Sequence, residues 1–201
     1  MTDAPMTDAP MTDAPMTDAP TADAPTADAP TADPATTEAP LTARTAAVVI
    51  RRATPADATE VTAMVREIAA HENQAAHVHV PDAQWHGLLE RPEVIVLLAE
   101  RGGAAVGYAS ALRQLHLWTG GDVLNLDDLY VRPGHRDAGV GRRLMAALAD
   151  LAAPERLLIR WGMEVDNVDA QRFYRRLGAT LRPKILAAWS PAAYTALAAD
   201  T

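Results

Sequence analysis

Residues 122–145 read DVLNLDDLYVRPGHRDAGVGRRLM, and this stretch decides the fold. Its first ten residues predict a strand over 122–131, and apolar residues then recur at helical spacing from Val140 onward. Glycine lowers helix stability by about 1 kcal/mol relative to alanine, so Gly139 and Gly141 at a helix start need a reason. The unpaired N–H groups of a helix start attract phosphate. The turn is therefore either a phosphate-binding loop or a strand-to-helix connection in which glycine serves geometry alone.

The rest of the chain alternates strand and helix signals. Short β-branched runs bounded by glycine turns indicate strands, and apolar stripes that follow capping residues indicate helices. We expect strands over residues 47–51, 94–100, 104–112, 122–131, 156–161 and 180–188. We expect helices that begin at Thr54, near Pro81-Asp82 and near Gly139, and a fourth over 167–177, with inward residues Val61, Met64, Val65, Ile68, Trp85, Leu88, Leu89, Val140, Leu144, Met145, Leu148 and Leu151. This order predicts an α/β fold with a mixed, mostly antiparallel central sheet flanked by helices.

Residues 1–44 differ in composition from everything that follows. The first forty residues repeat MTDAP and close variants and contain no Leu, Ile, Val or aromatic side chain. They hold eight of the 26 acidic residues and none of the 18 basic ones, so residues 41–201 are formally neutral. Such a segment has too little apolar surface to offset the entropy of ordering. We expect a disordered acidic tail over 1–44, either a tolerated repeat expansion or an interaction arm, and one domain over 45–201.

Composition excludes several classes of site. Cysteine is absent, which rules out disulfides and thiolate metal sites. No signal peptide and no run near the ~20 apolar residues of a membrane span is present, so we expect a cytoplasmic protein without membrane contact. We expect no metal, because His77-x-His79 lacks the ligand pattern of zinc hydrolases. Nucleic acid is not expected either, because Arg172, Arg175 and Arg176 form one solvated helix face or contacts to cofactor phosphates.

Two motifs together resemble those of the GNAT N-acetyltransferase superfamily. The first is Arg136-x-x-Gly139-x-Gly141 after the strand that ends in DDLYV, and the second is NVDAQRFY at 167–174. Three shorter stretches are similar to the branch of diamine (spermidine/spermine) and thialysine acetyltransferases, namely HENQ at 71–74, Leu117-Trp118-x-Gly120, and LDDLYVRP at 126–133. The resemblance covers about residues 47–188. It implies acetyl-CoA as the acetyl donor and a small-molecule amine as acceptor, and it is compatible with a homodimer.

The resemblance also assigns the cofactor residues. The strand residues Leu129, Tyr130 and Val131 would pair with the pantetheine arm through their main chain. The loop would bind the pyrophosphate, and the full set of cofactor residues is Leu129, Tyr130, Val131, Arg136, Asp137, Ala138, Gly139, Val140, Gly141, Arg142, Asn167 and Phe173. Asp137 departs from the Arg-Gly-basic-Gly-x-Gly form that the superfamily often has. A carboxylate there repels pyrophosphate, so we expect weakened cofactor affinity.

Catalysis in this family implies roles for a tyrosine and an acid. Tyr174 matches the tyrosine that protonates the departing thiolate, and its alternative is a half-buried aromatic that packs beside Phe173. Asp127 matches an acid that holds the acceptor ammonium or takes its proton, and its alternative is a structural carboxylate. Asp127 and Asp128 are adjacent on a strand, so we expect their side chains on opposite faces. The expected substrate residues are Asp127, Asp128, Glu72 and Trp161.

Three functions remain open at this point. The first is acetyl transfer to a polyamine or a lysine-like amino acid. The second keeps the chemistry but uses an aminoglycoside-type amine or a protein N-terminus as acceptor. The third is a CoA-binding regulatory module without turnover, because a fold does not by itself fix a function.

Overall fold

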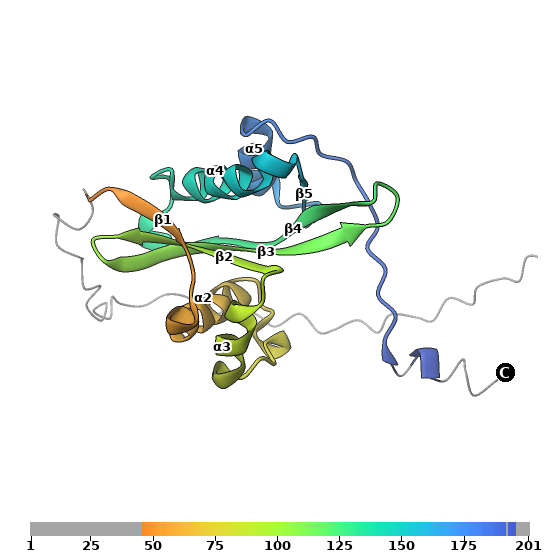
Figure 1. The fold of residues 1–201 in the computed structure, drawn as a ribbon, viewed down its shortest axis with the longest axis horizontal. Coiled ribbons are helices and arrows are strands. Elements are labelled where there is room, and N and C mark those ends of the chain that lie inside the picture. Colours follow the sequence, from red (N-terminus) through yellow and green to blue (C-terminus); the bar gives the residue numbers. More distant parts are fainter. Residues whose placement is uncertain (1–45, 192, 196–201) are drawn as a thin grey trace, which may run out of the picture. The chain divides into compact units, whose positions relative to one another are not determined.

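The computed structural model describes residues 46–191 and 193–195. The tail expected over 1–44 lies outside the described residues, so the domain boundary stays a prediction. The described part contains a five-stranded sheet in the order β1-β2-β3-β4-β5, with helices on both faces (Figure 1). The strands are β1 (Val48–Arg52), β2 (Val94–Arg101), β3 (Ala104–His116), β4 (Gly121–Val131) and β5 (Leu158–Arg160). The longer helices are α2 (Ala58–His71), α3 (Asp82–Glu90), α4 (Val140–Ala152) and α5 (Val168–Arg176).

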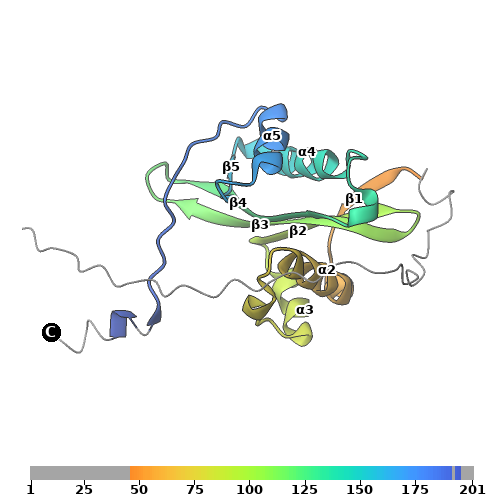
Figure 2. The same ribbon diagram turned by 180° about the vertical axis from the view of Figure 1, so that it is seen from behind.

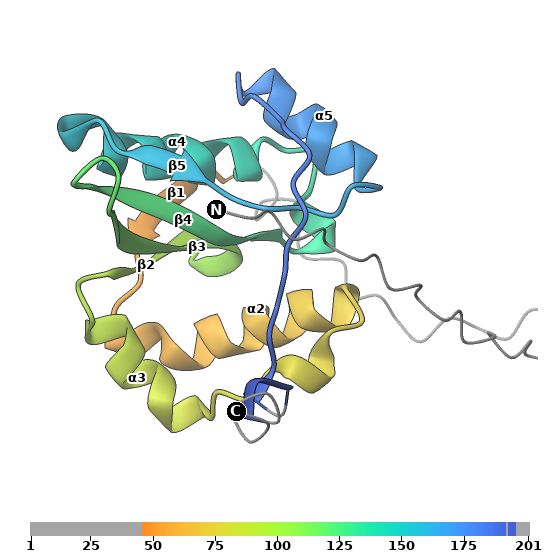
Figure 3. The ribbon, with the colours of Figure 1, turned by 90° about the vertical axis from the view of Figure 1, so that its right-hand side faces the viewer.

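The predicted α/β architecture is confirmed. β1 to β4 pair antiparallel with their neighbours, and β5 pairs parallel with β4. The helices α2 and α3 cover one face of the sheet, and α4 and α5 cover the other, which Figure 3 shows from the side. We call these the α2/α3 face and the α4/α5 face. Because β2 is buried on both faces, its sequence VIVLLAER is a continuous apolar run up to its last residues.

Each face of the sheet has its own apolar core. Side chains alternate along a strand, so neighbours in sequence enter different cores. On the α2/α3 face the buried residues are Ala53, Val61, Met64, Leu89, Val96, Leu98, Tyr108 and Tyr130. On the α4/α5 face they include Ile95, Leu97, Ala99, Val106, Ala109, Leu124, Leu126, Leu144, Leu148 and Tyr174. The strands therefore hold both helical layers in fixed positions around the sheet.

The start of α2 follows the sequence signal, with one added turn. Thr54 precedes a 3₁₀ turn over Pro55–Asp57, and its N–H and hydroxyl both donate to the Asp57 carboxylate at 2.8 Å. Asp57 also pairs with Arg51 of β1 at 2.6 Å. This pairing holds the pKa of Asp57 well below its usual range. The helix start is thus tied to the first strand. Shorter 3₁₀ turns lie at Ala75–His77, Pro133–His135 and Ala153–Glu155.

Three sequence expectations are wrong. Leu151 was expected in the core but is 43% exposed, because the buried stripe of α4 continues at Ala152 instead. The strand expected over 156–161 is limited to Leu158–Arg160, because Arg156 takes a left-handed conformation (φ 56°) that ends the preceding turn. The strand expected over 180–188 does not form, since residues 181–190 have no regular secondary structure and no neighbouring strand to pair with. Within residues 46–191 and 193–195, no helix combines the length and apolarity that a bilayer crossing needs.

Candidate active site

The site begins where β4 and β5 part. The two strands pair only at Val123↔Leu158, Leu124↔Ile159 and Asn125↔Arg160. A ladder of side chains holds the last of these pairs, because Arg160 Nε donates to Asn125 Oδ1 at 2.6 Å and Asn125 Nδ2 donates to Gln114 Oε1 at 2.7 Å. Beyond Asn125, β4 continues to Val131 without pairing to β5. The backbone of residues 126–131 therefore presents an open edge on the β5 side.

A β-bulge at Asp127 lies two residues after this last pair. Ser110 pairs with Asp128 and Ala111 pairs with Leu126, so Asp127 is an extra residue in β4. Leu126 and Leu129 both pack against the core of the α4/α5 face. The two residues between them must then both face α2 and α3. The expectation that Asp127 and Asp128 point to opposite faces is wrong, because the bulge interrupts the alternation on which it rested.

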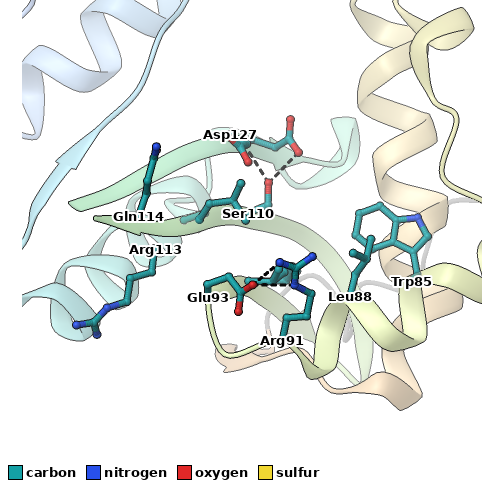
Figure 4. Close-up of a pocket in the computed structure, with 13 residues that line it drawn as sticks. Trp85, Leu88, Arg91, Glu93, Ser110, Arg113, Gln114 and Asp127 are labelled. Carbon is teal, nitrogen blue, oxygen red and sulfur yellow. Dashed lines mark hydrogen bonds and ion pairs between the residues drawn. The ribbon is translucent and has the colours of Figure 1, made fainter. Parts of the chain in front are cut away.

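Both carboxylates line a pocket of about 560 Å³ on the α2/α3 face. Its walls come from α3, from the start of β2 and from the middle of β3 and β4 (Figure 4). The lining residues are Trp85, Leu88, Arg91, Glu93, Val94, Val96, Ser110, Ala111, Leu112, Arg113, Gln114, Asp127 and Asp128. An ion pair between Arg91 and Glu93 lies on one wall. The pocket combines an apolar floor with a negative end, which suits an alkyl ammonium group.

The two carboxylates differ in their surroundings. Ser110 Oγ donates to Asp128 Oδ2 at 2.8 Å and accepts from the Asp128 N–H at 3.1 Å, so Asp128 is fixed in place. Asp127 has no such partner among the described contacts, and its side chain remains exposed. Desolvation, followed by the charge of Asp128, raises the pKa of Asp127 above its ordinary value. Asp127 is therefore more basic than an ordinary carboxylate.

Glu72 lies on the same side of the sheet as the two aspartates. It ends α2 as an exposed residue. Its charge acts on Tyr108, a fully buried residue of β3 whose hydroxyl also interacts with Asp128. Burial and the nearby charge of Asp128 raise the pKa of Tyr108 far above its ordinary value, so its phenol stays neutral. Glu72 thus adds negative charge to this face but does not line the pocket.

The glycine loop lies at the other end of the open edge. Gly139 has φ 74° and Asp137 has φ 59°, so both take the left-handed conformation. Gly139 is the N-cap of α4 and supplies no capping side chain. The first backbone bond of the helix runs from the Arg143 N–H to the Gly139 carbonyl at 3.1 Å, so the N–H groups just before it are available to a ligand. A Cβ at Gly139 would meet nothing within 4 Å, which shows open space in front of the loop.

Some of the other residues predicted for the cofactor loop are free to contact a ligand, and others pack within the protein. Arg136 and Arg142 are exposed beside the helix start. Arg136 Nε donates to the Val131 carbonyl at 2.9 Å, so its guanidinium lies across the end of the open edge. Gly141 packs closely, because a Cβ there would lie 3.5 Å from the Phe173 ring. Gly139 therefore answers a conformational need, whereas Gly141 lies in van der Waals reach of Phe173 on α5, where a Cβ would fit.

The second motif forms α5 and its cap. Asn167 Oδ1 accepts a hydrogen bond from the Ala170 N–H at 3.0 Å, which is the N-cap of the helix. Tyr174 is 8% exposed within the core of the α4/α5 face. Its ring lies 4.6 Å from that of Trp161 and 5.1 Å from that of Phe173. Burial raises the pKa of Tyr174 to about 12, so the phenol keeps its proton at neutral pH.

Trp161 lies apart from the pocket that contains Asp127. It follows β5 directly and packs against the core of the α4/α5 face. Its indole N–H is buried and has no hydrogen-bond partner among the described residues. A buried donor without a partner is costly, so this atom marks a position where a polar ligand group would be favourable. Trp161 and Tyr174 thus form one cluster, and Asp127 and Asp128 form another.

A match to a family model now decides the family. The model of the Acetyltransferase (GNAT) family matches residues 62–179, which is more than half of the chain. The chain belongs to the GNAT family. It is an acyltransferase, and the motifs at Arg136–Gly141 and Asn167–Tyr174 lie within the matched range.

Curated relatives agree with the branch that the sequence predicted. Thialysine N-epsilon-acetyltransferase of Sus scrofa is 29% identical over 150 residues, which cover 67% of this GNAT chain and 85% of that protein. Spermidine/spermine N(1)-acetyltransferase-like protein 1 of Homo sapiens is 30% identical over 112 residues, 51% of this chain and 16% of that protein. A solved aminoglycoside N-acetyltransferase, AAC(6')-Iy in complex with CoA, shares the fold with a TM-score of 0.61 and 18% identity, covering 73% of this chain and 96% of that chain.

Sequence reasoning missed part of this GNAT site. Ser110, Trp85 and the Gln114–Asn125–Arg160 ladder were not singled out. Ser110 is a polar residue inside the apolar run AVGYASAL, and hairpin pairing of β3 with β4 would have placed it opposite the aspartates. Trp85 was expected only to face the core, yet it lines the pocket. Among residues 46–191 and 193–195, no group of three or more His, Asp or Glu side chains is placed to hold a metal ion.

Proposed function

We propose that the chain transfers the acetyl group of acetyl-CoA to a primary amine of a small molecule, a polyamine or a lysine-like amino acid, by direct attack in a ternary complex. The observation that carries this proposal is the position of the Asp127 bulge. It lies two residues beyond the last β4–β5 pair. The acidic pocket of the α2/α3 face therefore adjoins the open edge of β4, where the family resemblance places the acyl donor.

The residues present fit acetyl-CoA at three points. The open edge from Leu126 to Val131 has unpaired main-chain groups for a pantetheine arm. The start of α4 offers N–H groups and space for a pyrophosphate, with Arg136 and Arg142 beside it. The unpartnered indole N–H of Trp161 lies in the cluster with Tyr174. Bound acetyl-CoA would supply the activated thioester, and Asp137 would weaken its binding by repulsion.

The amine must lose a proton before it attacks. An alkyl ammonium has a pKa of about 10.4 in water, and Asp127 and Asp128 stabilise its charged form in the pocket. Asp127 takes this proton, directly or through water, because its raised pKa makes it a better base than an ordinary carboxylate. The neutral amine would then bond to the acetyl carbon of bound acetyl-CoA, and the carbon–sulfur bond would break. Tyr174 would give its phenolic proton to the departing thiolate, and one proton of the attacking nitrogen would pass through water to the Tyr174 phenolate, so that the products are the acetylated amine and the free thiol.

The pocket favours an acceptor that is apolar along its length and cationic at its end. Leu88, Val94 and Leu112 supply apolar contacts, while the carboxylates lie at one end. The curated relatives named for thialysine and spermidine/spermine support such acceptors. We further propose that the enzyme acts as a homodimer, and the cytoplasmic location expected from the sequence stays a prediction.

A panel assay tests the acceptor. The full chain is mixed with acetyl-CoA and one acceptor, which is spermidine, thialysine, an aminoglycoside or a peptide with a free N-terminal amine. The release of free CoA thiol is then followed. Spermidine or thialysine should give the highest kcat/KM. A preference for the aminoglycoside or the peptide would move the acceptor to the second class. If the chain binds acetyl-CoA but acetylates none of the amines, it would be a CoA-binding regulatory module and not an enzyme.

A further inference from the structure

An ion pair lies on the wall of the acidic pocket, away from its two aspartates. Arg91 and Glu93 both line the pocket, and the Nε and Nη2 groups of Arg91 donate to the same oxygen, Oε1 of Glu93. A guanidinium has five N–H donors, so this pair uses only part of what Arg91 offers. The two side chains are 58% and 38% exposed, and exposed ion pairs contribute little to stability. The pair is therefore accessible to a ligand that enters the pocket.

The backbone around this ion pair is held in place. Leu88 and Arg91 are three residues apart at the end of α3, so both lie on the face of the helix that lines the pocket. Figure 2 shows α3 on the same side of the sheet as α2. The Arg91 N–H donates to the Leu88 carbonyl at 3.2 Å, and the Val94 N–H donates to the Arg91 carbonyl at 3.1 Å. The Glu93 carbonyl accepts from the Arg113 N–H of β3 at 2.9 Å. The pair thus has a fixed position beside the start of β2.

The strand pairing gives the distance between the ion pair and the aspartates. Val94, the residue after Glu93, pairs with Leu112 of β3. Two residues back along β3, Ser110 pairs with Asp128 of β4. Two strand spacings of about 4.8 Å, and two residues of about 3.4 Å each, place the backbones of Val94 and Asp128 about 12 Å apart. A ligand that contacts both ends must therefore carry two polar groups joined by a spacer of several bonds.

The two ends of the pocket also differ in charge. Asp127 and Asp128 form one end, which attracts a single ammonium group. The other end has one guanidinium and one carboxylate, so it is neutral as a whole but has two separate charges. A second ammonium group there would be attracted by Glu93 and repelled by Arg91. The head of a free amino acid, an α-carboxylate beside an α-ammonium, can pair with both charges at once.

We propose that Arg91 and Glu93 bind the amino-acid head of the acceptor, Arg91 through the α-carboxylate and Glu93 through the α-ammonium. The distal amine then lies at Asp127 and Asp128. This inference rests on the proposed function of the same pocket, and it narrows the acceptor to a lysine-like amino acid. A polyamine has no carboxylate, so it offers no opposite charge to the guanidinium. Arg91 is thereby a specificity-determining residue of this chain.

Two acceptors that differ only in the carboxylate test this assignment. They are thialysine and its decarboxylated diamine, bis(2-aminoethyl) sulfide. With the full chain and acetyl-CoA, kcat/KM should be about tenfold or more higher for thialysine, because a hydrogen bond to a charged group is involved. Arg91→Met should lower this ratio by about tenfold or more through the KM for thialysine. As a control, Arg66→Met removes an arginine of similar exposure that pairs with Asp82 outside this pocket, and it should leave the ratio unchanged.

The methyl ester of thialysine separates recognition from a structural role of Arg91. In the unaltered chain, esterification should raise KM by about tenfold, because it removes the charge that Arg91 binds. In Arg91→Met it should make little further difference, because the contact is already absent. An equal loss of kcat/KM on thialysine, its ester and the diamine in Arg91→Met would show that Arg91 acts only on the structure, and would overturn the assignment.

Calorimetry in the presence of CoA measures the binding of thialysine and of the diamine separately from acetyl transfer. If thialysine binds more tightly than the diamine only when Arg91 is present, yet no amine is acetylated, the proposed transfer fails and this inference stands. If the unaltered chain acetylates both acceptors with equal kcat/KM, or if Arg91→Met keeps the original ratio, the transfer stands and this inference is wrong.

Discussion

The two ends of the sheet contrast in how they are stabilised. From β2 to the middle of β4 the strands are long and antiparallel, and their central residues are buried, with side chains such as Val96, Leu97 and Leu98 almost fully covered. From the Asp127 bulge onward the pairing stops, β5 has three residues, and the following segment is exposed. In the first region, strands of the same chain pair with one another along their full length. The second is left open where we propose that acetyl-CoA binds.

The largest expected effect lies in the second region, at Tyr174. Tyr174→Phe keeps the ring and its packing against Trp161 but removes the proton donor. If Tyr174 protonates the thiolate, kcat should fall by about 10²- to 10⁴-fold, the usual contribution of a positioned acid. The free energy of unfolding should change little. Steady-state kinetics and chemical denaturation measure the two effects on the same protein.

Tyr108→Phe is the matched change in the first region. It also removes a buried hydroxyl, at a residue that does not line the pocket. Its kcat should change far less than that of Tyr174→Phe. Equal losses in the two variants, or full activity in Tyr174→Phe, would show that Tyr174 is a packing residue.

The next effect compares the stability of the two regions. Leu98 is fully buried in the core of the α2/α3 face, so Leu98→Ala should lower the free energy of unfolding by about 2–5 kcal/mol at any protein concentration. Leu186 is 95% exposed, so Leu186→Ala should change the free energy of unfolding by less than about 0.5 kcal/mol. Chemical denaturation of both variants checks this. A loss in Leu186→Ala as large as that in Leu98→Ala would mean that the segment packs within the core of its own chain.

A smaller effect concerns the glycine loop. Gly139→Ala places a side chain at φ 74° and in front of the proposed pyrophosphate site. The strain should cost about 1–2 kcal/mol of stability, and acetyl-CoA affinity should fall about tenfold, or about 1.4 kcal/mol. Gly103→Ala has the same strain at φ 82° in the β2–β3 turn. Calorimetry should show normal affinity for that control, and equal losses in both variants would argue against the loop as the phosphate site.

The smallest expected effect is a shift in pH dependence. The charge of Asp128 helps to raise the pKa of Asp127, so Asp128→Asn should lower it. Asp127 acts as the ionised carboxylate, and the acid limb of kcat/KM for the amine should therefore move to lower pH, by up to about one unit. Asp122→Asn, at the other end of β4, should leave the limb in place. An unmoved limb in Asp128→Asn would mean that a different group controls it.

The sequence predicted the first region well because its signals are local. The apolar run at 94–100, the cap at Thr54 and the glycine turn at 102–103 each specify an element without reference to distant residues. The family motifs also placed Gly139, Asn167 and Tyr174 on the elements that the structure shows. The bulge at Asp127 was not predictable from alternation, because one unpaired residue reverses every orientation after it.

The second region was harder to predict because its pairing depends on non-local partners. Residues 180–188 have strand-like composition, yet none of the strands in the described part of the chain pairs with them. The pocket likewise needed the antiparallel pairing of β3 with β4 to bring Ser110 next to Asp128. Residue type alone does not reveal such a contact across the sheet. The roles of the individual site residues stay predictions.

The open edge of β4 also affects the tendency of the protein to aggregate. Unpaired strand edges promote aggregation, and proteins commonly cover them with a helix or loop or end them in a charge. Here the bulge and the guanidinium of Arg136 lie toward the two ends of the edge, and one residue after the edge β4 is followed by the turn at Pro133. A strand from another protein would need a longer uninterrupted edge than residues 128–131 provide. The interruption thus limits access to ligands that need only a few main-chain contacts, and the enzyme can keep an unpaired edge without becoming a template for fibrils.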